Sequence, residues 1–153
     1  MFSILQLEDV DRAEKIMRQM RALGFMPSLA EYNILIALHC AMSCPQKAVK
    51  VLEAMMRDGV APITQTFNLI ARGFKDAGDC EEALRILRIM GGRGAKSDSG
   101  SYELLLKIYA SQRCFKEFNA VMEEMQVNRF RLRPGAADEI RSLYYEASKA
   151  TML

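Results

Sequence analysis

The sequence predicts an all-α solenoid built from stacked helix-turn-helix hairpins, and two observations lead to this fold class. The first is an internal repeat, in which residues of one kind recur every 35 positions along the chain. The second is the apolar spacing within each repeat, which is that of helices separated by turn residues. Because a single helical hairpin cannot bury both of its apolar faces, successive hairpins must stack on one another.

The repeat keeps one register along the chain. Five columns share a residue type: methionine, alanine, glycine, an aromatic residue and a β-branched aliphatic residue. Their members are Met20, Met55, Met90 and Met125; Ala13, Ala48 and Ala83; Gly24, Gly59 and Gly94; Tyr32, Phe67 and Tyr102; and Ile16, Val51, Ile86 and Val121. Internal periods of this length are typical of repeat arrays.

Each repeat contains two helical stretches, which we call its first and second helix. In the repeat that begins at Leu29, the first helix places one face at Tyr32, Leu35, Ile36 and His39. The second helix has apolar residues at i, i+3, i+4 and i+7, namely Ala48, Val51, Leu52 and Met55. Both stretches are therefore expected to be amphipathic.

Turn residues separate the two helices and close each repeat. Residues 43–45, which end in Pro45, are expected to end one first helix. Residues 77–79 break the next, and Asp79 with Glu82 forms a capping-box pattern that opens the second helix. Gly59 is expected to form a left-handed C-cap, and Pro62 a helix stop.

These boundaries predict one solenoid domain over residues 1–153. It comprises a partial repeat at 1–28, full repeats at 29–63, 64–98 and 99–133, and a C-terminal capping helix at 136–153. The array begins in the middle of a repeat. In the capping helix, one apolar face is expected at Ile140, Leu143, Tyr144 and Ala147.

Composition limits the function classes. The net charge of +2, from 21 basic and 19 acidic residues, is too small to indicate nucleic-acid binding by itself. The longest apolar run, residues 34–38, is far shorter than the ~20 residues of a membrane span, so no membrane partner is predicted. The four cysteines form no C-x-x-C pair, which favours reduced thiols. Residues 1–7 carry no Arg, unlike a mitochondrial transit peptide.

Several segments carry a family resemblance. Glu31-Tyr32-Asn33 and Thr66-Phe67-Asn68 resemble the opening of a pentatricopeptide repeat, and residues 55–62 resemble its closing segment. The resemblance covers nearly the whole chain and is to the P-type subfamily with 35-residue repeats. It implies a right-handed superhelix that binds single-stranded RNA at one base per repeat. It also implies an organellar location, which we expect to be the mitochondrion, with the plastid as the alternative.

The resemblance also implies which residues read bases: the residue after the aromatic residue, paired with the last residue of the repeat. These pairs are Asn33 with Ile63, Asn68 with Asp98, and Glu103 with Arg133. Only Asn68 with Asp98 matches a pairing that the family uses, one associated with uridine. Ile63 cannot form a hydrogen bond through its side chain, and Glu103 brings a negative charge that Arg133 can neutralise.

Other positions depart from the family pattern. At the position where the family has an aliphatic residue that sandwiches the base, this chain has Ala30, Gln65 and Gly100. At the position where the family often has a lysine that contacts phosphate, it has Ala41, Asp76 and Ser111. Lys75 lies one position away from the lysine column and is expected to substitute for it in part. The basic run Arg129, Arg131 and Arg133 is either a turn that contacts phosphate or an ordinary solvated loop.

No catalytic, cofactor or metal site is predicted, and no small-molecule substrate. His39 is expected to be a core residue, and His39, Cys40 and Cys44 lack a fourth ligand for zinc. Residues 91–94 follow a helix as a closing turn, which is unlike a phosphate-binding loop. We therefore expect a protein that is not an enzyme, although the chain could also be the repeat portion of a longer enzyme.

Three full repeats can read about three nucleotides, and any given three-nucleotide sequence recurs roughly every 64 bases. The leading hypothesis is therefore a non-catalytic subunit of an organellar ribonucleoprotein. A mitochondrial ribosome is the expected host, in which the chain contacts ribosomal RNA and neighbouring proteins. The alternatives are an independent factor that binds single-stranded RNA for processing or stability, and a protein-only scaffold.

Overall fold

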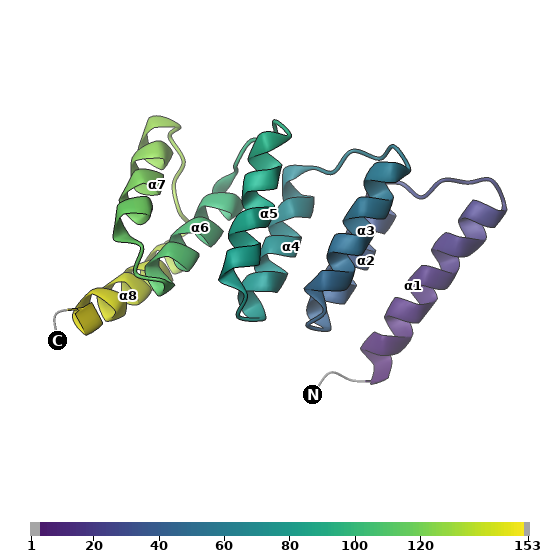
Figure 1. The fold of residues 1–153 in the computed structure, drawn as a ribbon, viewed down its shortest axis with the longest axis horizontal. Coiled ribbons are helices and arrows are strands. Elements are labelled where there is room, and N and C mark those ends of the chain that lie inside the picture. Colours follow the sequence, from purple (N-terminus) through teal and green to yellow (C-terminus); the bar gives the residue numbers. More distant parts are fainter. Residues whose placement is uncertain (1–3, 152–153) are drawn as a thin grey trace. The chain divides into compact units, whose positions relative to one another are not determined.

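A computed structural model of the chain describes residues 4–151, with side chains described for residues 8–149. The described residues form eight α-helices and no strand, so the all-α prediction is confirmed (Figure 1). The helices are α1 (Ile4–Ala22), α2 (Leu29–Ala41), α3 (Pro45–Arg57), α4 (Thr64–Asp76), α5 (Cys80–Gly92), α6 (Ser99–Ser111), α7 (Phe115–Val127) and α8 (Pro134–Thr151).

The chain divides into two compact units, Met1–Met90 and Gly91–Leu153, which we call unit 1 and unit 2. Unit 1 holds α1 to α4 and most of α5, and unit 2 holds α6 to α8. The predicted grouping into one domain with repeats at 29–63, 64–98 and 99–133 stays a prediction. Among residues 4–151, no helix combines the length and apolar character that crossing a membrane requires.

Helix starts follow local capping chemistry. Before α2, the backbone N–H of Ser28 donates to Glu31 Oε2 at 2.7 Å. Before α5, the backbone N–H of Glu82 donates to Asp79 Oδ1 at 3.2 Å, as the predicted capping pattern requires. Pro45 was expected to end the first helix, but α2 already ends at Ala41 and Pro45 is the first residue of α3. Proline suits this place because its fixed φ fits the first turn and no N–H is needed there.

The connections use left-handed backbone at fixed positions of the repeat. Gly59 has φ 79°, and the N–H of Val60 donates to Met55 O at 3.0 Å, which confirms the predicted C-cap. Arg129 occupies the same column and adopts φ 59° although it carries a side chain. A non-glycine residue in this conformation costs about 1–2 kcal/mol. The turn geometry is therefore kept where the glycine is absent.

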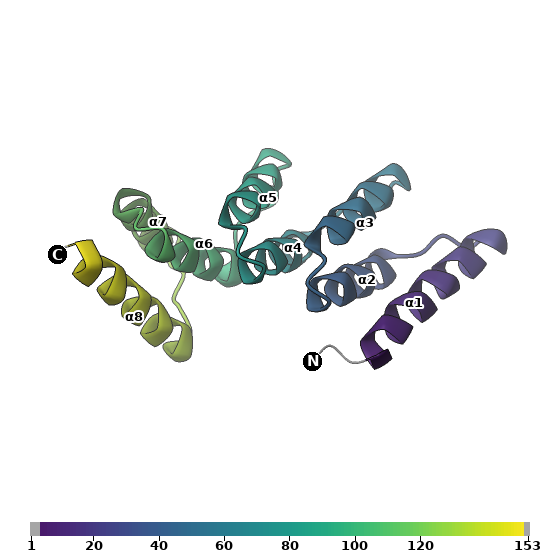
Figure 2. The same ribbon diagram turned by 60° about the horizontal axis from the view of Figure 1, so that its bottom comes forward.

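Unit 1 is organised in two layers. Figure 2 shows α2 and α4 side by side in one layer, and α3 and α5 in the other. Helix α2 contacts α1, α3 and α4. Where α2 meets α4, a Cβ at Gly73 would lie 2.6 Å from Cys40 Sγ, so a larger residue at this position would force Cys40 to shift. The core of unit 1 includes the buried side chains of Tyr32, Ile36 and Ile70.

Unit 2 has its own core, in which α6, α7 and α8 meet. The buried side chains are Tyr102, Leu106, Ala110, Phe118, Val121, Met125 and Ile140. Tyr144 of α8 stands against Phe115 with ring centroids 5.0 Å apart, and Leu143 and Tyr144 pack on the core. Helix α8 begins at Pro134, two residues before the predicted 136, because proline fits the first turn of a helix.

Candidate nucleic-acid interface

Four candidate RNA-binding residues lie on the first helices: Asn33 on α2 and Asn68 and Lys75 on α4 in unit 1, and Glu103 on α6 in unit 2. The other four lie in the connections between helices: Asp98, Arg129, Arg131 and Arg133. In unit 1, Asn33 and Ala37 of α2 and Asn68 and Arg72 of α4 occupy equivalent positions, one helical turn apart. In unit 2, Glu103 and Lys107 of α6 occupy these positions. We call these residues the first-helix face of each unit.

Asn33 is engaged in the packing of α2 on α4. Thr66 Oγ1 donates to Asn33 Oδ1 at 2.8 Å, and the backbone N–H of Ile63 donates to Thr66 Oγ1 at 3.2 Å. The predicted pair Asn33 and Ile63 therefore shares one buried threonine. Because one lone pair of Asn33 Oδ1 is used internally, the second lone pair and the amide nitrogen are left to meet a base.

Asn68 and Asp98 lie in different surroundings. Asn68 is buried, with 7% of its surface exposed, so little of the amide reaches solvent. Asp98 is the N-cap of α6, and its Oδ1 accepts from the backbone N–H of Ser101 at 2.9 Å. Its carboxylate therefore has a structural role. Asn68 belongs to unit 1 and Asp98 to unit 2, and their joint reading of uridine stays a prediction.

The structure brings Glu103 and Arg133 together, within a larger ion-pair network. Arg133 Nη2 lies 2.9 Å and 3.2 Å from the two carboxylate oxygens of Glu103. Lys107 Nζ lies 2.9 Å from Glu103 Oε1 and 3.0 Å from Glu139 Oε2 of α8. Sequence reasoning missed Lys107 and Glu139, although the i, i+4 spacing of Glu103 and Lys107 is a signal for such a pair. The network ties α6 to α8.

This network also sets the charge of Glu103. Burial alone would raise the pKa of the Glu103 carboxyl, but hydrogen bonds and ion pairs with Lys107 and Arg133 outweigh it and lower the pKa. Only 13% of the Glu103 side chain is exposed. The position that the resemblance assigns to base reading thus holds a carboxylate neutralised by two cations.

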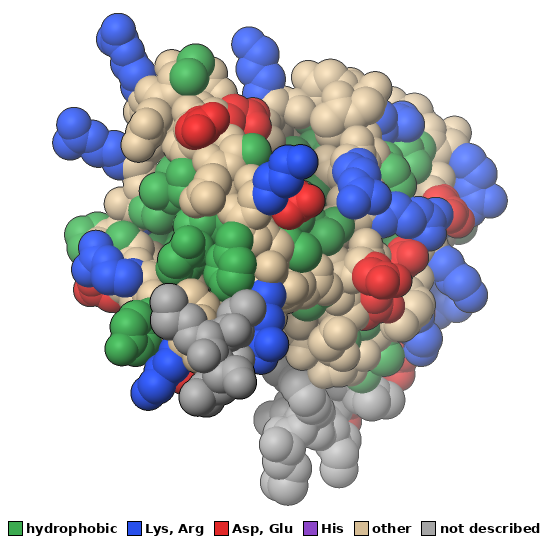
Figure 3. All heavy atoms as spheres, turned by 60° about the vertical axis from the view of Figure 1, so that its left-hand side comes forward, with side chains coloured by type: hydrophobic (Ala, Val, Ile, Leu, Met, Phe, Trp, Pro, Cys, Tyr) green, Lys and Arg blue, Asp and Glu red, His purple; other side chains and the backbone are tan. Residues whose placement is uncertain are grey.

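The predicted phosphate contacts differ in how available they are. Lys75 is half-buried, and its Nζ lies 4.0 Å from Asp76 Oδ1, which is a long ion pair. Arg129 and Arg131 are exposed and form no ion pair with any side chain among residues 8–149, whereas Arg133 is held by Glu103. Figure 3 shows Lys and Arg side chains projecting mostly around the margin of one face, with acidic side chains between them.

Sequence reasoning also missed Arg72. It is exposed on α4, one turn after Asn68, and makes no ion pair with another described side chain. The sequence does contain a signal for it, because Arg72 follows Asn68 by four residues and this spacing places both side chains on one face of the helix. Arg72 is therefore a cation of the first-helix face of unit 1 that is available to a phosphate.

Groups suited to metal binding are not assembled in the part of the chain with described side chains. His39 is 4% exposed, its Nε2 lies 3.4 Å from Glu14 Oε1, and burial lowers its pKa. Burial raises the pKa of Cys40 to about 11, which keeps this thiol protonated. No three His, Cys, Asp or Glu side chains among residues 8–149 gather as metal ligands.

Known proteins resemble the chain over most of its length. The family model described as the pentacotripeptide-repeat region of PRORP matches residues 2–152. The large ribosomal subunit protein mL102 (rPPR5) of Arabidopsis thaliana is 34% identical over 110 residues, which cover 72% of this chain and 14% of that protein. A chloroplastic pentatricopeptide repeat-containing protein of Arabidopsis thaliana is 29% identical over 117 residues, covering 76% of this chain and 15% of its own length. The chain thus spans about one seventh of these relatives.

Solved structures show the same fold. The repeat protein PPR10 in complex with an 18-nt psaJ RNA element matches with a TM-score of 0.73 and 23% identity, covering 90% of this chain and 20% of that one. The PPR domain of Arabidopsis thaliana protein-only RNase P 1 in complex with tRNA matches with a TM-score of 0.74 and 19% identity, covering 88% and 69%. The predicted solenoid of helical hairpins is thereby confirmed, and the chain belongs to the pentatricopeptide repeat family.

Proposed function

We propose that the chain is a non-catalytic RNA-contacting part of an organellar ribonucleoprotein, and that the particle is a mitochondrial ribosome. The observation that carries this proposal is the 34% identity to a protein of the large ribosomal subunit, over 72% of this chain. The relatives include proteins named as mitochondrial and as chloroplastic, which supports an organellar location. That this organelle is the mitochondrion is the more specific part of the proposal.

The first-helix faces support a fixed component over a sequence reader. Glu103 is neutralised by Arg133 and Lys107, and the Asn33 carbonyl is bonded to Thr66. A base that used these groups would have to replace internal bonds, each of which contributes to stability in the free protein. In an assembled particle, contacts of Arg72, Arg129 and Arg131 with the phosphate backbone of RNA would position the chain without reading the base sequence.

Two alternatives make different predictions. An independent RNA factor would use Asn68 with Asp98 to prefer uridine, so that Asn68→Ala would abolish this preference. The unpaired Arg72 beside Asn68 favours this alternative over a protein-only scaffold. A scaffold would bind its partners with little dependence on salt, since no phosphate counterions would be released.

The test is native purification of the tagged protein from mitochondria and, separately, from plastids, with and without RNase, followed by sizing. The proposal expects the protein to travel with a mitochondrial ribosomal particle and to leave it when RNase breaks the particle down. A small complex that RNase leaves unchanged would overturn the proposal and favour the scaffold. Release as a short ribonucleoprotein without ribosomal proteins would favour the independent factor.

A further inference from the structure

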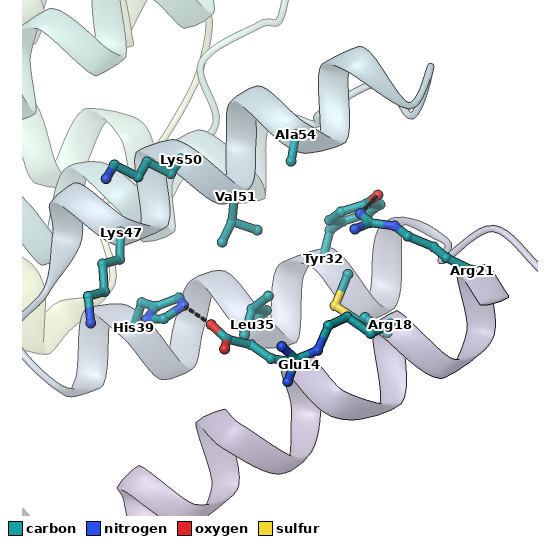
Figure 4. Close-up of a pocket in the computed structure, with 11 residues that line it drawn as sticks. Glu14, Arg18, Arg21, Tyr32, Leu35, His39, Lys47, Lys50, Val51 and Ala54 are labelled. Carbon is teal, nitrogen blue, oxygen red and sulfur yellow. Dashed lines mark hydrogen bonds and ion pairs between the residues drawn. The ribbon is translucent and has the colours of Figure 1, made fainter.

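Unit 1 has an open groove on the side of the second helices. It lies between α1 and α3, with α2 as its floor, and its cavity volume is about 420 Å³. Figure 4 shows side chains from all three helices directed into the space between them. This volume lies within the range of about 300–1,000 Å³ that ligand pockets occupy.

The floor of the groove is largely apolar. Met17 of α1, Leu35 of α2, and Val51 and Ala54 of α3 line it. The Tyr32 ring also borders the groove, but Tyr32 is only 1% exposed, so no aromatic face is offered for stacking. Binding of single-stranded RNA draws much of its energy from such stacking. Met17 and Leu35 are also only 5% and 6% exposed, so the accessible apolar surface of the groove comes mainly from Val51 and Ala54. This surface suits small aliphatic side chains better than bases.

The rims carry positive charge on both sides. Arg18 projects from α1, and Lys47 and Lys50 project from α3 (Figure 4). All three are exposed, and none forms an ion pair with a side chain among residues 8–149. An occupant that fits both rims must carry acidic groups on both of its flanks.

The other charged groups of the groove, Arg21 and Glu14, have partners within unit 1. Arg21 Nη2 donates to Asp58 Oδ2 and to the Tyr32 hydroxyl, both at 2.9 Å. Glu14 Oε1 lies 3.4 Å from Nε2 of His39. Because burial lowers the pKa of His39, its imidazole does not cancel the Glu14 carboxylate, so the rims carry the three cations Arg18, Lys47 and Lys50 and one carboxylate, Glu14. The groove is thus cationic although the whole chain carries only +2.

We propose that this groove binds an amphipathic helix of another protein, one with an aliphatic stripe flanked on both sides by Asp and Glu. An aliphatic stripe at i, i+3, i+4 and i+7 would fill the floor between α1 and α3, as helices do when they occupy apolar grooves. The acidic flanks would meet Arg18 on one rim and Lys47 and Lys50 on the other. This inference goes beyond the proposed function, since the contact needs no RNA.

The test is selection from a library of helical peptides with a fixed leucine stripe and randomised flanking positions, against the purified full chain. Wild-type protein is expected to enrich Asp and Glu on both flanks. The charge-reversed variant Lys47→Glu/Lys50→Glu is expected to select Lys and Arg on the flank that faces α3. The matched control Lys15→Glu/Arg88→Glu, with the same charge change outside the groove, is expected to select as the wild type does.

The best peptide is then measured by fluorescence anisotropy. Binding is expected to weaken about tenfold in Lys47→Glu/Lys50→Glu, because two exposed ion pairs are replaced by repulsion. Thermal melting checks that this variant is folded, which the exposure of both lysines leads us to expect. Failure to enrich acidic flanks, identical selection by both double variants, or displacement of the peptide by a uridine oligonucleotide would each overturn the inference.

Discussion

The contact between α2 and α4 at Gly73 predicts a substitution whose sign is opposite to that of helix propensity. Alanine normally stabilises a helix interior over glycine by about 1 kcal/mol. At residue 73, however, the new Cβ would lie 2.6 Å from Sγ and 3.0 Å from Cβ of Cys40. Both distances are below van der Waals contact, and overpacking of this kind costs about 1–3 kcal/mol. Since the Cys40 Cβ cannot move without its backbone, we expect Gly73→Ala to lose up to about 2 kcal/mol net.

The assay is thermal and urea unfolding followed by circular dichroism. The expected loss lowers Tm by up to about 8 °C for a chain of this size. Gly91→Ala in α5 is the matched control, because a Cβ there meets nothing within 4 Å, and it is expected to raise stability. In a Cys40→Ala background, which lacks the sulfur, the cost of Gly73→Ala is expected to fall by at least 0.5 kcal/mol, as coupled neighbours do. If Gly73→Ala stabilised the protein as Gly91→Ala does, the close approach of α2 and α4 would be refuted.

Three further predictions concern the candidate interface. Arg129→Gly is expected to stabilise the chain by about 0.5–1 kcal/mol in urea unfolding, because it relieves left-handed backbone at φ 59°, and Arg131→Gly is expected to give no such gain. Arg72→Ala is expected to reduce the slope of log K against log salt for uridine RNA by about 0.7, and an unchanged slope would remove Arg72 from the interface. The folded pKa of Glu103 lies below its ordinary value of 4.5, so its stabilisation is complete above pH 4.5 and is lost as pH falls through the folded pKa. Glu103→Gln is therefore expected to be less stable at pH 7 and to show a smaller fall in Tm between pH 6 and pH 3.

The fold could be predicted from the sequence because its determinants are local and repeated. Apolar spacing and capping residues such as Asp79 and Gly59 act within one hairpin, so the helices could be predicted without knowing the tertiary structure. Pro45 was misinterpreted for the same reason. A proline is compatible with the start of one helix as well as with the end of another, and the pattern alone does not decide between them.

The candidate site could be predicted from the sequence only in part. Glu103 and Arg133 were paired by analogy and do meet, but Glu139 joins them through the packing of α8 on α6, which no local pattern encodes. The bond between Thr66 and Asn33 likewise depends on how two first helices stack. Charge patterning could have suggested Arg72, whereas the cationic groove depends on how α1, α2 and α3 pack together and has no signature within one repeat.

Helix α2 lies between two surfaces of unit 1 that suit different partners. At about 100° per residue, Asn33 and Ala37 fall on nearly the opposite side of α2 from Leu35 and His39. Asn33 faces α4 through Thr66, whereas Leu35 and His39 line the groove between α1 and α3. RNA on the first-helix face and a protein helix in the groove would therefore not compete for space. A short array gains specificity in this way, because two modest contacts to neighbours in one particle reinforce each other when both are held at once.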